Sequence, residues 1–374
     1  MRILKNKSFK SAYISIIISA LVFASLYAIS TFNKIGFSFY DSTPSTLPTK
    51  PKIQEKSEWL TNFVDPLIGI KEGDVFPGPC LPFGVVKVGI DTHDAGYAVD
   101  EAVTGISRAD EPKYGVISQF PFTTSMDSFD LHNYSSIRSL ERYEVGYGLI
   151  GLKRYNLVVE LTASRRAALH KYSFPPLINE SHIMIDLSHI NSYGQYVSGE
   201  ISVTSNEMKG FGRYKDWRFG PQYSVYFCSQ FDTNASDYYT FWNGKITRDS
   251  TYETSGIYPI GAILGFDTTK PMQSVIKSRV GISFMSVDQA CKNAQEEIPN
   301  WDFDLTREKA VEAWEVELEK IQVTDGTDDL KKIFYSNLYR TMITPSDRTG
   351  ENPNWVSFDK NGRIIPNYDD FLTL

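Results

Sequence analysis

Cysteine and histidine are scarce in this chain. Its 374 residues include 3 cysteines and 5 histidines. Cys80, Cys228 and Cys291 are widely spaced, which argues against a disulfide framework and against the CxxC pairs of common zinc sites. Buried free thiols are the default prediction, and one Cys80–Cys228 bridge is the alternative in an oxidising compartment. The histidines show no i, i+4 pairing, so no histidine metal site is predicted.

Several catalytic signatures are also missing. The sequence has no Gly-x-Ser-x-Gly elbow, no P-loop and no Rossmann fingerprint, so serine-triad hydrolysis and nucleotide chemistry have no support. The formal net charge is -7, and no basic block stands out beyond the N-terminus. This balance argues against nucleic acid as a partner.

Acidic residues are absent before Asp41, and an uncharged run over residues 11–33 follows a basic start at Arg2, Lys5, Lys7 and Lys10. A positive segment before an apolar span predicts export. The run is longer than a usual signal-peptide core and approaches the roughly 20 residues that cross a bilayer. A cleaved signal and an uncleaved anchor that associates with the membrane therefore both stay open. Residues 1–40 are predicted to be this segment and residues 41–58, rich in Ser, Thr, Pro and Lys, a flexible linker.

Short apolar or alternating runs broken by Gly, Pro, Asn and Asp fill the next part of the chain. Examples are Leu149–Leu161, His182–Ile190, Tyr223–Phe231 and Ile260–Phe266. Many such runs with turn signals between them predict a large antiparallel β-sandwich. We place it over residues 59–286.

The hydrophobic period changes to that of helices after Val287. One short helix is predicted over Asp288–Ile298, and a second over Leu305–Ile321 with Asp304 as its N-cap. A third is predicted over Asp328–Met342. Their apolar residues, which include Trp314, Leu318, Phe334 and Leu338, have the spacing of faces that are covered by other elements.

Five segments together resemble glycoside hydrolase family 92, the calcium-dependent exo-α-mannosidases. They are FVDPLIG at residues 63–69, FPGPCLPFG at 76–84, PKYGVISQ at 112–119, and the longer stretches 146–175 and 280–304. The resemblance implies an N-terminal β-sandwich, a helical connector at residues 287–326, and an (α/α)6 barrel. Residues 327–374 are then expected to be a truncated start of that barrel.

The resemblance also implies a chemistry. Family members are inverting enzymes, in which a carboxylic acid and a carboxylate roughly 6.5 to 9.5 Å apart flank the glycosidic bond. A calcium ion, bound by oxygen ligands, holds the mannose. The residues with these roles are expected beyond this chain, so no catalytic or metal residue is assigned within it. Because neighbouring residues on one extended or helical segment point in different directions, the adjacent Asp369 and Asp370 are not expected to form the carboxyl pair.

Loops of the N-terminal domain are expected to contribute to the sugar pocket. The sequence departs here from the family pattern, because Gly105–Gly115 lacks two histidines of the matching loop and is shorter. We predict contacts with a mannose-containing glycan from Asp74, Tyr97, Ser107 and Arg108. The altered loop puts ordinary α-1,2-mannosidase specificity in doubt.

Other polar residues are predicted to be structural. Arg165 and Arg166 are expected to face solvent and to pair with charges across the sheet. Glu296 and Glu297 are expected at a solvated helix end, and His170 is expected as a satisfied, half-buried residue.

Three hypotheses follow. The first is an exported exo-α-mannosidase represented by an incomplete chain, whose partner is the missing catalytic domain. The second is a non-catalytic surface module that binds carbohydrate or protein. The third is a degenerate homologue that has lost its pocket.

Three Asn-x-Ser sequences match the glycosylation acceptor pattern, at Asn133, Asn179 and Asn234. Such matches arise easily by chance, and they have meaning only if the source is eukaryotic.

Overall fold

The structure is a computed structural model. It describes residues 59–71, 76–93, 97–107, 116–190, 194–216, 222–270 and 273–351, together with the backbone of strands β17 (Val356–Phe358) and β18 (Ile364–Pro366). All of these belong to one compact unit, Lys50–Leu374. The predicted signal or anchor at residues 1–40 and the linker at 41–58 lie outside the described residues. Within the described ranges, no helix has both the length and the apolar character that a membrane crossing requires.

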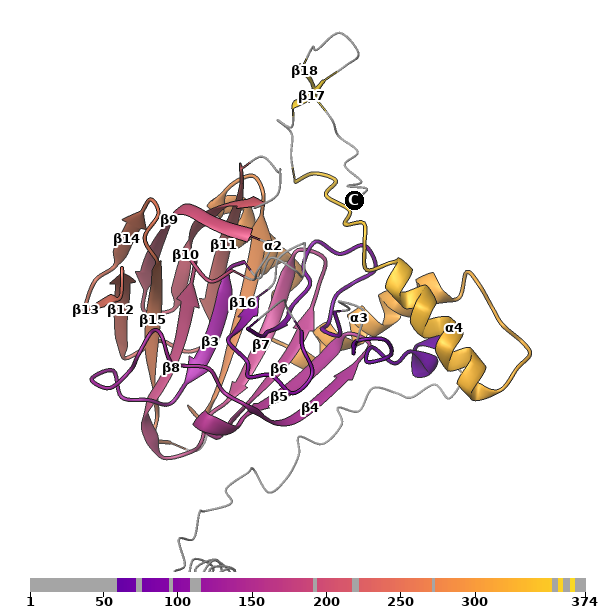
Figure 1. Cartoon of the computed structure of the whole chain (residues 1–374), viewed down its shortest axis with the longest axis horizontal. Coiled ribbons are helices and arrows are strands. Elements are labelled where there is room, and N and C mark those ends of the chain that lie inside the picture. Colours follow the sequence, from indigo (N-terminus) through magenta and orange to yellow (C-terminus); the bar gives the residue numbers. More distant parts are fainter. Residues whose placement is uncertain are drawn as a thin grey trace, which may run out of the picture. The chain divides into compact units, whose positions relative to one another are not determined.

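Antiparallel strands dominate the chain up to Ser283 (Figure 1). They are β1 (Gly89–Asp91), β2 (Gly105–Ser107), β3 (Ser118–Phe122), β4 (Arg138–Glu144), β5 (Tyr147–Leu152), β6 (Leu157–Ala163), β7 (Ala167–Ser173), β8 (Ile178–Asp186), β9 (Gly194–Thr204), β10 (Glu207–Asp216), β11 (Gln222–Phe231), β12 (Asp237–Trp242), β13 (Lys245–Arg248), β14 (Tyr252–Ser255), β15 (Ile260–Thr268) and β16 (Val275–Ser283). A nine-stranded sheet has the order β14-β9-β10-β11-β16-β7-β6-β5-β4, and a five-stranded sheet the order β13-β12-β15-β8-β3. β1 pairs with β2 alone.

The two larger sheets share one hydrophobic core. Phe120 and Ile183 of the five-stranded sheet belong to the same buried cluster as Val159 and Phe227 of the nine-stranded sheet. Alternation produces this core, because successive side chains of a strand point to opposite faces. In β16, for example, Ile276 is buried while its neighbour Val275 is exposed. The mainly β, antiparallel prediction is confirmed.

A buried polar network also joins the sheets. Gln119 of β3 donates from Nε2 to the hydroxyl of Tyr172 on β7 at 2.6 Å, and its Oε1 accepts from Ser229 of β11 at 3.0 Å. The Tyr172 hydroxyl also lies 2.9 Å from His170 Nδ1. His170 is therefore hydrogen-bonded, as predicted, but it is fully buried rather than half-buried.

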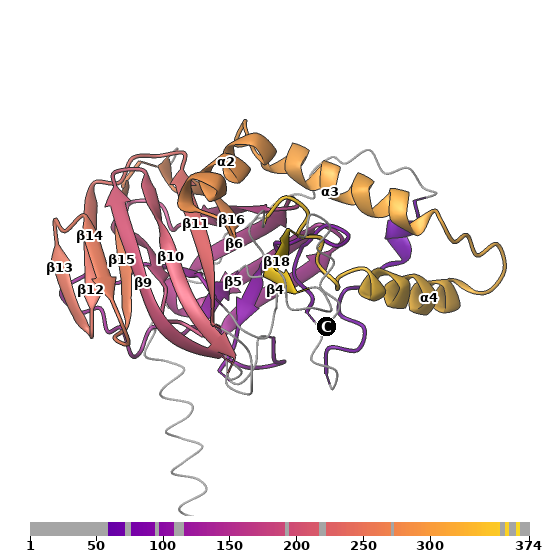
Figure 2. The ribbon, with the colours of Figure 1, turned by 90° about the horizontal axis from the view of Figure 1, so that it is seen from above.

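Helices cover part of the outer face of the nine-stranded sheet. Every residue of β5 and β6 is buried. Outward residues such as Leu149 and Val158 pack with Ile298 and Phe303, at the end of one helix and the start of the next. Figure 2 shows these helices, α2 and α3, along one side of the sheets. A strand buried on both faces has a continuous apolar sequence, as in LVVELTA of β6.

The three predicted helices are present with shifted ends. α2 spans Val287–Glu297 and its N-cap is Ser286, which accepts from Gln289 N. α3 spans Phe303–Leu318 and α4 spans Asp328–Thr341. The cap predicted at Asp304 was wrong. Asp302 accepts from Leu305 N instead, so α3 begins earlier and ends before Ile321.

Helix α4 is buried along a face formed by Tyr335, Ser336 and Tyr339. This face packs on η1 (Leu60–Phe63), and α4 also lies beside α3. The predicted apolar positions Leu330, Ile333 and Phe334 are 61%, 52% and 37% exposed. The start of an (α/α)6 barrel stays a prediction.

Candidate functional site

At Gly105, beside the predicted sugar loop, the β1–β2 pair lies against β3 and the end of β8. It pairs with Asp91 in the β1–β2 register. A Cβ added at Gly105 would lie 2.2 Å from Ser118 Oγ, 2.8 Å from His189 Nε2 and 3.0 Å from Asp91 Oδ2. A glycine is needed here because any side chain would occupy the space that these three groups share.

Asp91 is the centre of this cluster. It ends β1, its side chain is 2% exposed, and its Oδ1 accepts from the hydroxyl of Ser107 at 2.8 Å. Its Oδ2 lies 3.2 Å from Nε2 of His189. A carboxylate can stay charged at such depth only when it is paired and hydrogen-bonded. The cluster of Asp91, Ser107 and His189, which we call the Asp91 cluster, is therefore a built polar site inside an apolar fold.

His189 is electrostatically matched to this carboxylate. Burial lowers the pKa of His189, but the hydrogen bond and charge of Asp91 and the charge of Asp186 outweigh it, and the net pKa is raised. The backbone N–H of His189 donates to Asp186 Oδ1 at 3.1 Å. Because Asp186 is the last residue of β8, the backbone of His189 is held at a strand end of the sandwich.

Aromatic hydroxyls surround the Asp91 cluster. Burial and the charges of Asp186 and Asp91 raise the pKa of Tyr134, and burial with Asp186 raises that of Tyr196. The hydroxyl of Tyr196 is buried without a hydrogen-bond partner among the residues that the structure describes. The site thus combines a carboxylate–imidazole pair with a serine hydroxyl and phenolic hydroxyls, which are groups that can bind a polyhydroxylated ligand or support loops that do so.

Of the four predicted sugar-contacting residues, the structure describes Ser107 and Tyr97, and Ser107 belongs to the Asp91 cluster. The hydroxyl of Tyr97 donates to Glu141 Oε2 at 3.2 Å, and Arg138 lies over its ring at 5.1 Å. Burial first, and then the charge of Glu141, raise the pKa of Tyr97 to about 12. Tyr97 therefore belongs to a separate polar group, which it forms with Glu141 and Arg138. Asp74 and Arg108 lie outside the described residues.

Sequence reasoning missed Asp91 and His189. Each has an ordinary local signal, an Asp at the end of the apolar run VVKVGID and a His after the strand HIMIDL. Nothing in the sequence pairs the two, because the contact forms only when β1 is brought beside the end of β8.

A second polar cluster joins the segment after α4 to the sandwich. Glu351 is 1% exposed. Its Oε2 accepts from Ser283 Oγ at 2.6 Å, and its Oε1 accepts from Asn293 Nδ2 at 2.9 Å and pairs with Arg166 Nε at 3.0 Å. Lys87 donates to Ser346 Oγ, after α4, at 2.5 Å, and also to Gly84 O in the matched segment FPGPCLPFG at 2.9 Å. The polypeptide after α4 is thus fixed to the sandwich at several points.

The prediction for Arg165 and Arg166 was right that both pair with charged groups, but it was wrong about where the partners lie. Arg165 pairs with Asp347, and Arg166 pairs with Glu351 and donates to Thr349 O at 2.6 Å, so both bind the segment after α4. Glu296 is exposed at the end of α2 as predicted, whereas Glu297 at the same helix end accepts from the backbone N–H of Arg166 at 2.7 Å. The sequence around a charged residue in a short β-turn does not indicate which distant segment will fold over it and pair with it.

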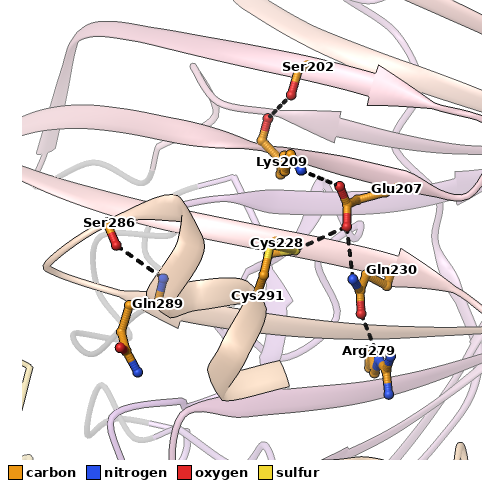
Figure 3. Close-up of a disulfide and its surroundings, with 9 residues drawn as sticks. All are labelled: Ser202, Glu207, Lys209, Cys228, Gln230, Arg279, Ser286, Gln289 and Cys291. Carbon is orange, nitrogen blue, oxygen red and sulfur yellow. Dashed lines mark hydrogen bonds and ion pairs between the residues drawn. A yellow bond between two sulfur atoms is a disulfide. The ribbon is translucent and has the colours of Figure 1, made fainter. Parts of the chain in front are cut away.

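A disulfide fastens α2 to the nine-stranded sheet (Figure 3). Cys228 of β11 is bonded to Cys291 of α2, with 4.9 Å between their Cα atoms, and Cys80 is a buried free thiol. The Cys80–Cys228 alternative was therefore wrong, and so was the default of free thiols for Cys228 and Cys291. Burial raises the pKa of the Cys80 thiol to about 11.

The one group of acidic, cysteine or histidine side chains that is close enough to share a metal ion, among the described residues, does not fit calcium. It consists of Glu207 with Cys228 and Cys291. The two sulfurs are bonded to each other, and calcium requires six to eight oxygen ligands. We therefore route no step of the chemistry through a metal held by these residues.

Comparison with known families accounts for this architecture. The model of the glycosyl hydrolase family 92 N-terminal domain matches residues 63–283, and that of the family 92 catalytic domain matches residues 289–372. The first match alone spans more than half of the chain. The chain therefore belongs to glycosyl hydrolase family 92.

Individual relatives agree with this assignment. An uncharacterized secreted glycosidase from Arthroderma benhamiae is 29% identical and covers 84% of this chain, while this chain spans 44% of that protein. The family GH92 α-mannosidase BT3965 from Bacteroides thetaiotaomicron is 22% identical, with a TM-score of 0.73 over 84% of this chain and 45% of its own. The inverting mannosidase BT2199 from strain VPI-5482 of that species is 22% identical, with a TM-score of 0.68 over 83% of this chain and 42% of its own. At this identity the two structures show a shared fold.

Proposed function

We propose that this chain is part of an exported exo-α-mannosidase that removes terminal mannose from glycans. The observation that carries the proposal is the consecutive match of the family 92 N-terminal and catalytic domains along one chain. Both matched solved proteins are named as mannosidases, and BT3965 was also solved with mannoimidazole. Export is supported by the relative described as secreted and by the disulfide between Cys228 and Cys291.

The chemistry of the complete enzyme is proposed to be inverting hydrolysis, with the two catalytic carboxyl groups outside the residues of this chain. The support is coverage, because the chain spans less than half of each relative it matches. The calcium ion expected for the family is likewise proposed for the complete enzyme. On this proposal residues 59–286 form the β-sandwich domain, 287–326 the connector and 327–374 the start of the catalytic domain.

The sandwich is proposed to build one wall of the sugar pocket. The Asp91 cluster supports this role, because its buried ion pair fixes Ser107 at the start of the loop that replaces the family's histidine-containing segment. The predicted sugar contacts of Asp74, Tyr97, Ser107 and Arg108 stay part of this proposal. Since the Ser107 hydroxyl already donates to Asp91, a sugar would be bound by its remaining acceptor capacity.

A free-standing binding module is a weaker proposal. Its helices should not display wide apolar faces to water. Leu330 and Ile333 of α4 and Val316 of α3 are more than half exposed. The apolar run at residues 11–33, as a cleaved signal or as an uncleaved membrane anchor, is independent of this choice and stays part of the proposal.

The test is hydrolysis by the complete protein that contains this chain. A terminal α-mannoside is incubated with it, and proton NMR records the anomer of mannose released first. Release of β-mannose that stops on addition of a calcium chelator and resumes with calcium is expected. A folded complete protein that releases no mannose from α-mannosides in the presence of calcium would contradict the proposal.

A further inference from the structure

The three Asn-x-Ser sequences are not part of the candidate glycosidase site, and their environments in the structure differ. Asn133, Asn179 and Asn234 are all exposed. Asn133 is engaged, because its Oδ1 accepts from Arg154 Nη1 at 3.2 Å. Within the described part of the chain, the side-chain amides of Asn179 and Asn234 make no hydrogen bond. These two amides are free to carry a substituent.

Asn234 lies in the connection between β11 and β12. The backbone around it is fixed, because Ala235 N donates to Ser205 O at 2.6 Å and Ser236 N donates to Gly265 O at 2.8 Å. Ser236, which supplies the hydroxyl of the acceptor sequence, is exposed like the asparagine. A substituent on this amide would therefore point into solvent without displacing any packed group.

Asn179 is the second residue of β8. It lies two residues after Leu177, which is 71% exposed at the connection from β7. Its acceptor hydroxyl differs from that of Asn234, because Ser181 is buried and bonds with Thr268 Oγ1 at 2.7 Å. Attachment at this site must therefore precede folding of β8, as it does when a chain is modified during its export.

Both asparagines lie toward the end of the five-stranded sheet that is remote from the Asp91 cluster. Asn179 is seven residues before Asp186 in β8, about 23 Å at 3.3 Å per residue. Asn234 precedes Asp237, which pairs with Gly265, whereas Asp186 pairs with Gly261 nearer the other end of β15. Large substituents at Asn179 and Asn234 would leave the candidate site open.

We propose that Asn179 and Asn234 are sites of N-linked glycosylation. The donor is a lipid-linked oligosaccharide diphosphate. A bond forms between the asparagine Nδ2 and the anomeric carbon of the sugar, and the bond from that carbon to the diphosphate oxygen breaks. The amide loses one proton, and the lipid diphosphate leaves with the electron pair. This modification rests on the exported location proposed above and on a eukaryotic source for the chain.

The test is expression of the full chain in a yeast secretory host. Intact mass and peptide maps are recorded before and after peptide N-glycosidase, which leaves aspartate where a glycan was attached. Asn179→Gln and Asn234→Gln should each remove one enzyme-sensitive mass increment, and the double variant should remove both. Ser236→Thr should keep the modification of Asn234 and Ser236→Ala should abolish it. Asn300→Gln, at an exposed asparagine outside any acceptor sequence, should change nothing.

Recovery of Asn179 and Asn234 as unmodified asparagine overturns the proposal, and an unmodified peptide from one of them overturns it for that site. Cell fractionation then separates the two causes. An unmodified chain in the medium or on the membrane leaves export intact and rejects only the glycosylation sites. An unmodified chain in the cytosol rejects export as well.

Discussion

Arg166 Nε lies 3.0 Å from Oε1 of Glu351, and this ion pair joins the β6–β7 connection to the segment that follows α4. The Glu351 carboxylate receives hydrogen bonds from Ser283, Phe284 N and Asn293 as well. A buried ion pair is stable when its remaining hydrogen-bonding capacity is satisfied in this way. The pair therefore fixes the polypeptide of the catalytic-domain match on the N-terminal domain.

Removal of the carboxylate should destabilise the protein strongly. We expect Glu351→Ala to lower the free energy of unfolding by about 3 to 5 kcal/mol, because it leaves the buried donors of Ser283 and Asn293 without this acceptor and removes the nearer carboxylate partner of Arg166. Urea denaturation of the full chain measures the change. Glu296→Gln is the control, since Glu296 forms an exposed ion pair with Lys292 within α2. A change in unfolding free energy within about 0.5 kcal/mol is expected for it. Equal effects of the two substitutions would contradict the assigned role.

The disulfide should stabilise the protein because it closes a long loop in the unfolded chain. The cysteines are 63 residues apart, for which loop-closure entropy gives about 4 kcal/mol as an upper value. Cys228→Ser combined with Cys291→Ser should lower the urea midpoint, and a reductant should lower the midpoint of the wild-type chain alone. Thiol titration of the unfolded, unreduced chain should find only Cys80. Three reactive thiols without reductant would contradict the bridge.

The pairing of His189 with Asp91 should make stability depend on pH. The folded-state pKa of His189 is raised above its ordinary 6.5, so its contribution is fully present below pH 6.5. It is lost as pH rises through the raised folded value. The difference in unfolding free energy between wild type and His189→Gln should therefore shrink from pH 6 to pH 9, measured by urea denaturation at each pH. A difference that grows with pH would reverse the assignment.

His182 should show the opposite dependence. Burial lowers its pKa to about 4, so the unfolded chain binds a proton that the folded chain does not. Stability is then expected to fall as pH drops from 6.5 toward 4. His182→Phe, which keeps an aromatic ring against Phe122, should reduce this acid sensitivity in thermal unfolding curves. An unchanged acid slope in the variant would show that other groups cause it.

Substitution of Gly105 should disturb the Asp91 cluster. Gly105→Ala places a Cβ 2.2 Å from Ser118 Oγ, and such overpacking costs about 1 to 3 kcal/mol. Gly256→Ala is the control, because nothing lies within 4 Å of the Cβ it would add. Chemical denaturation compares the two variants. Loss of stability in the control but not at Gly105 would mean that the close approach is absent.

Local sequence patterns determined most of the elements. Alternation in β16 and the continuous apolar run of β6 identify strands, and helical spacing after Val287 identifies α2, α3 and α4. Helix boundaries were less certain because capping depends on which side chain actually reaches the free N–H groups. Asp302 and Asp304 are equivalent by sequence, and only the chain path selected Asp302.

Partners distant in sequence were decided by the tertiary structure. The disulfide choice required β11 and α2 to be adjacent, and Arg166 was assigned to solvent because its partner Glu351 lies in a segment that folds back later. The pair of Asp91 and His189 was not predicted for the same reason. Sequence by itself determined the family, the strands and the helical period, since these depend on residues close together in the chain. The tertiary structure alone decided which buried charges meet, because burial selects partners by position in space rather than by order along the chain.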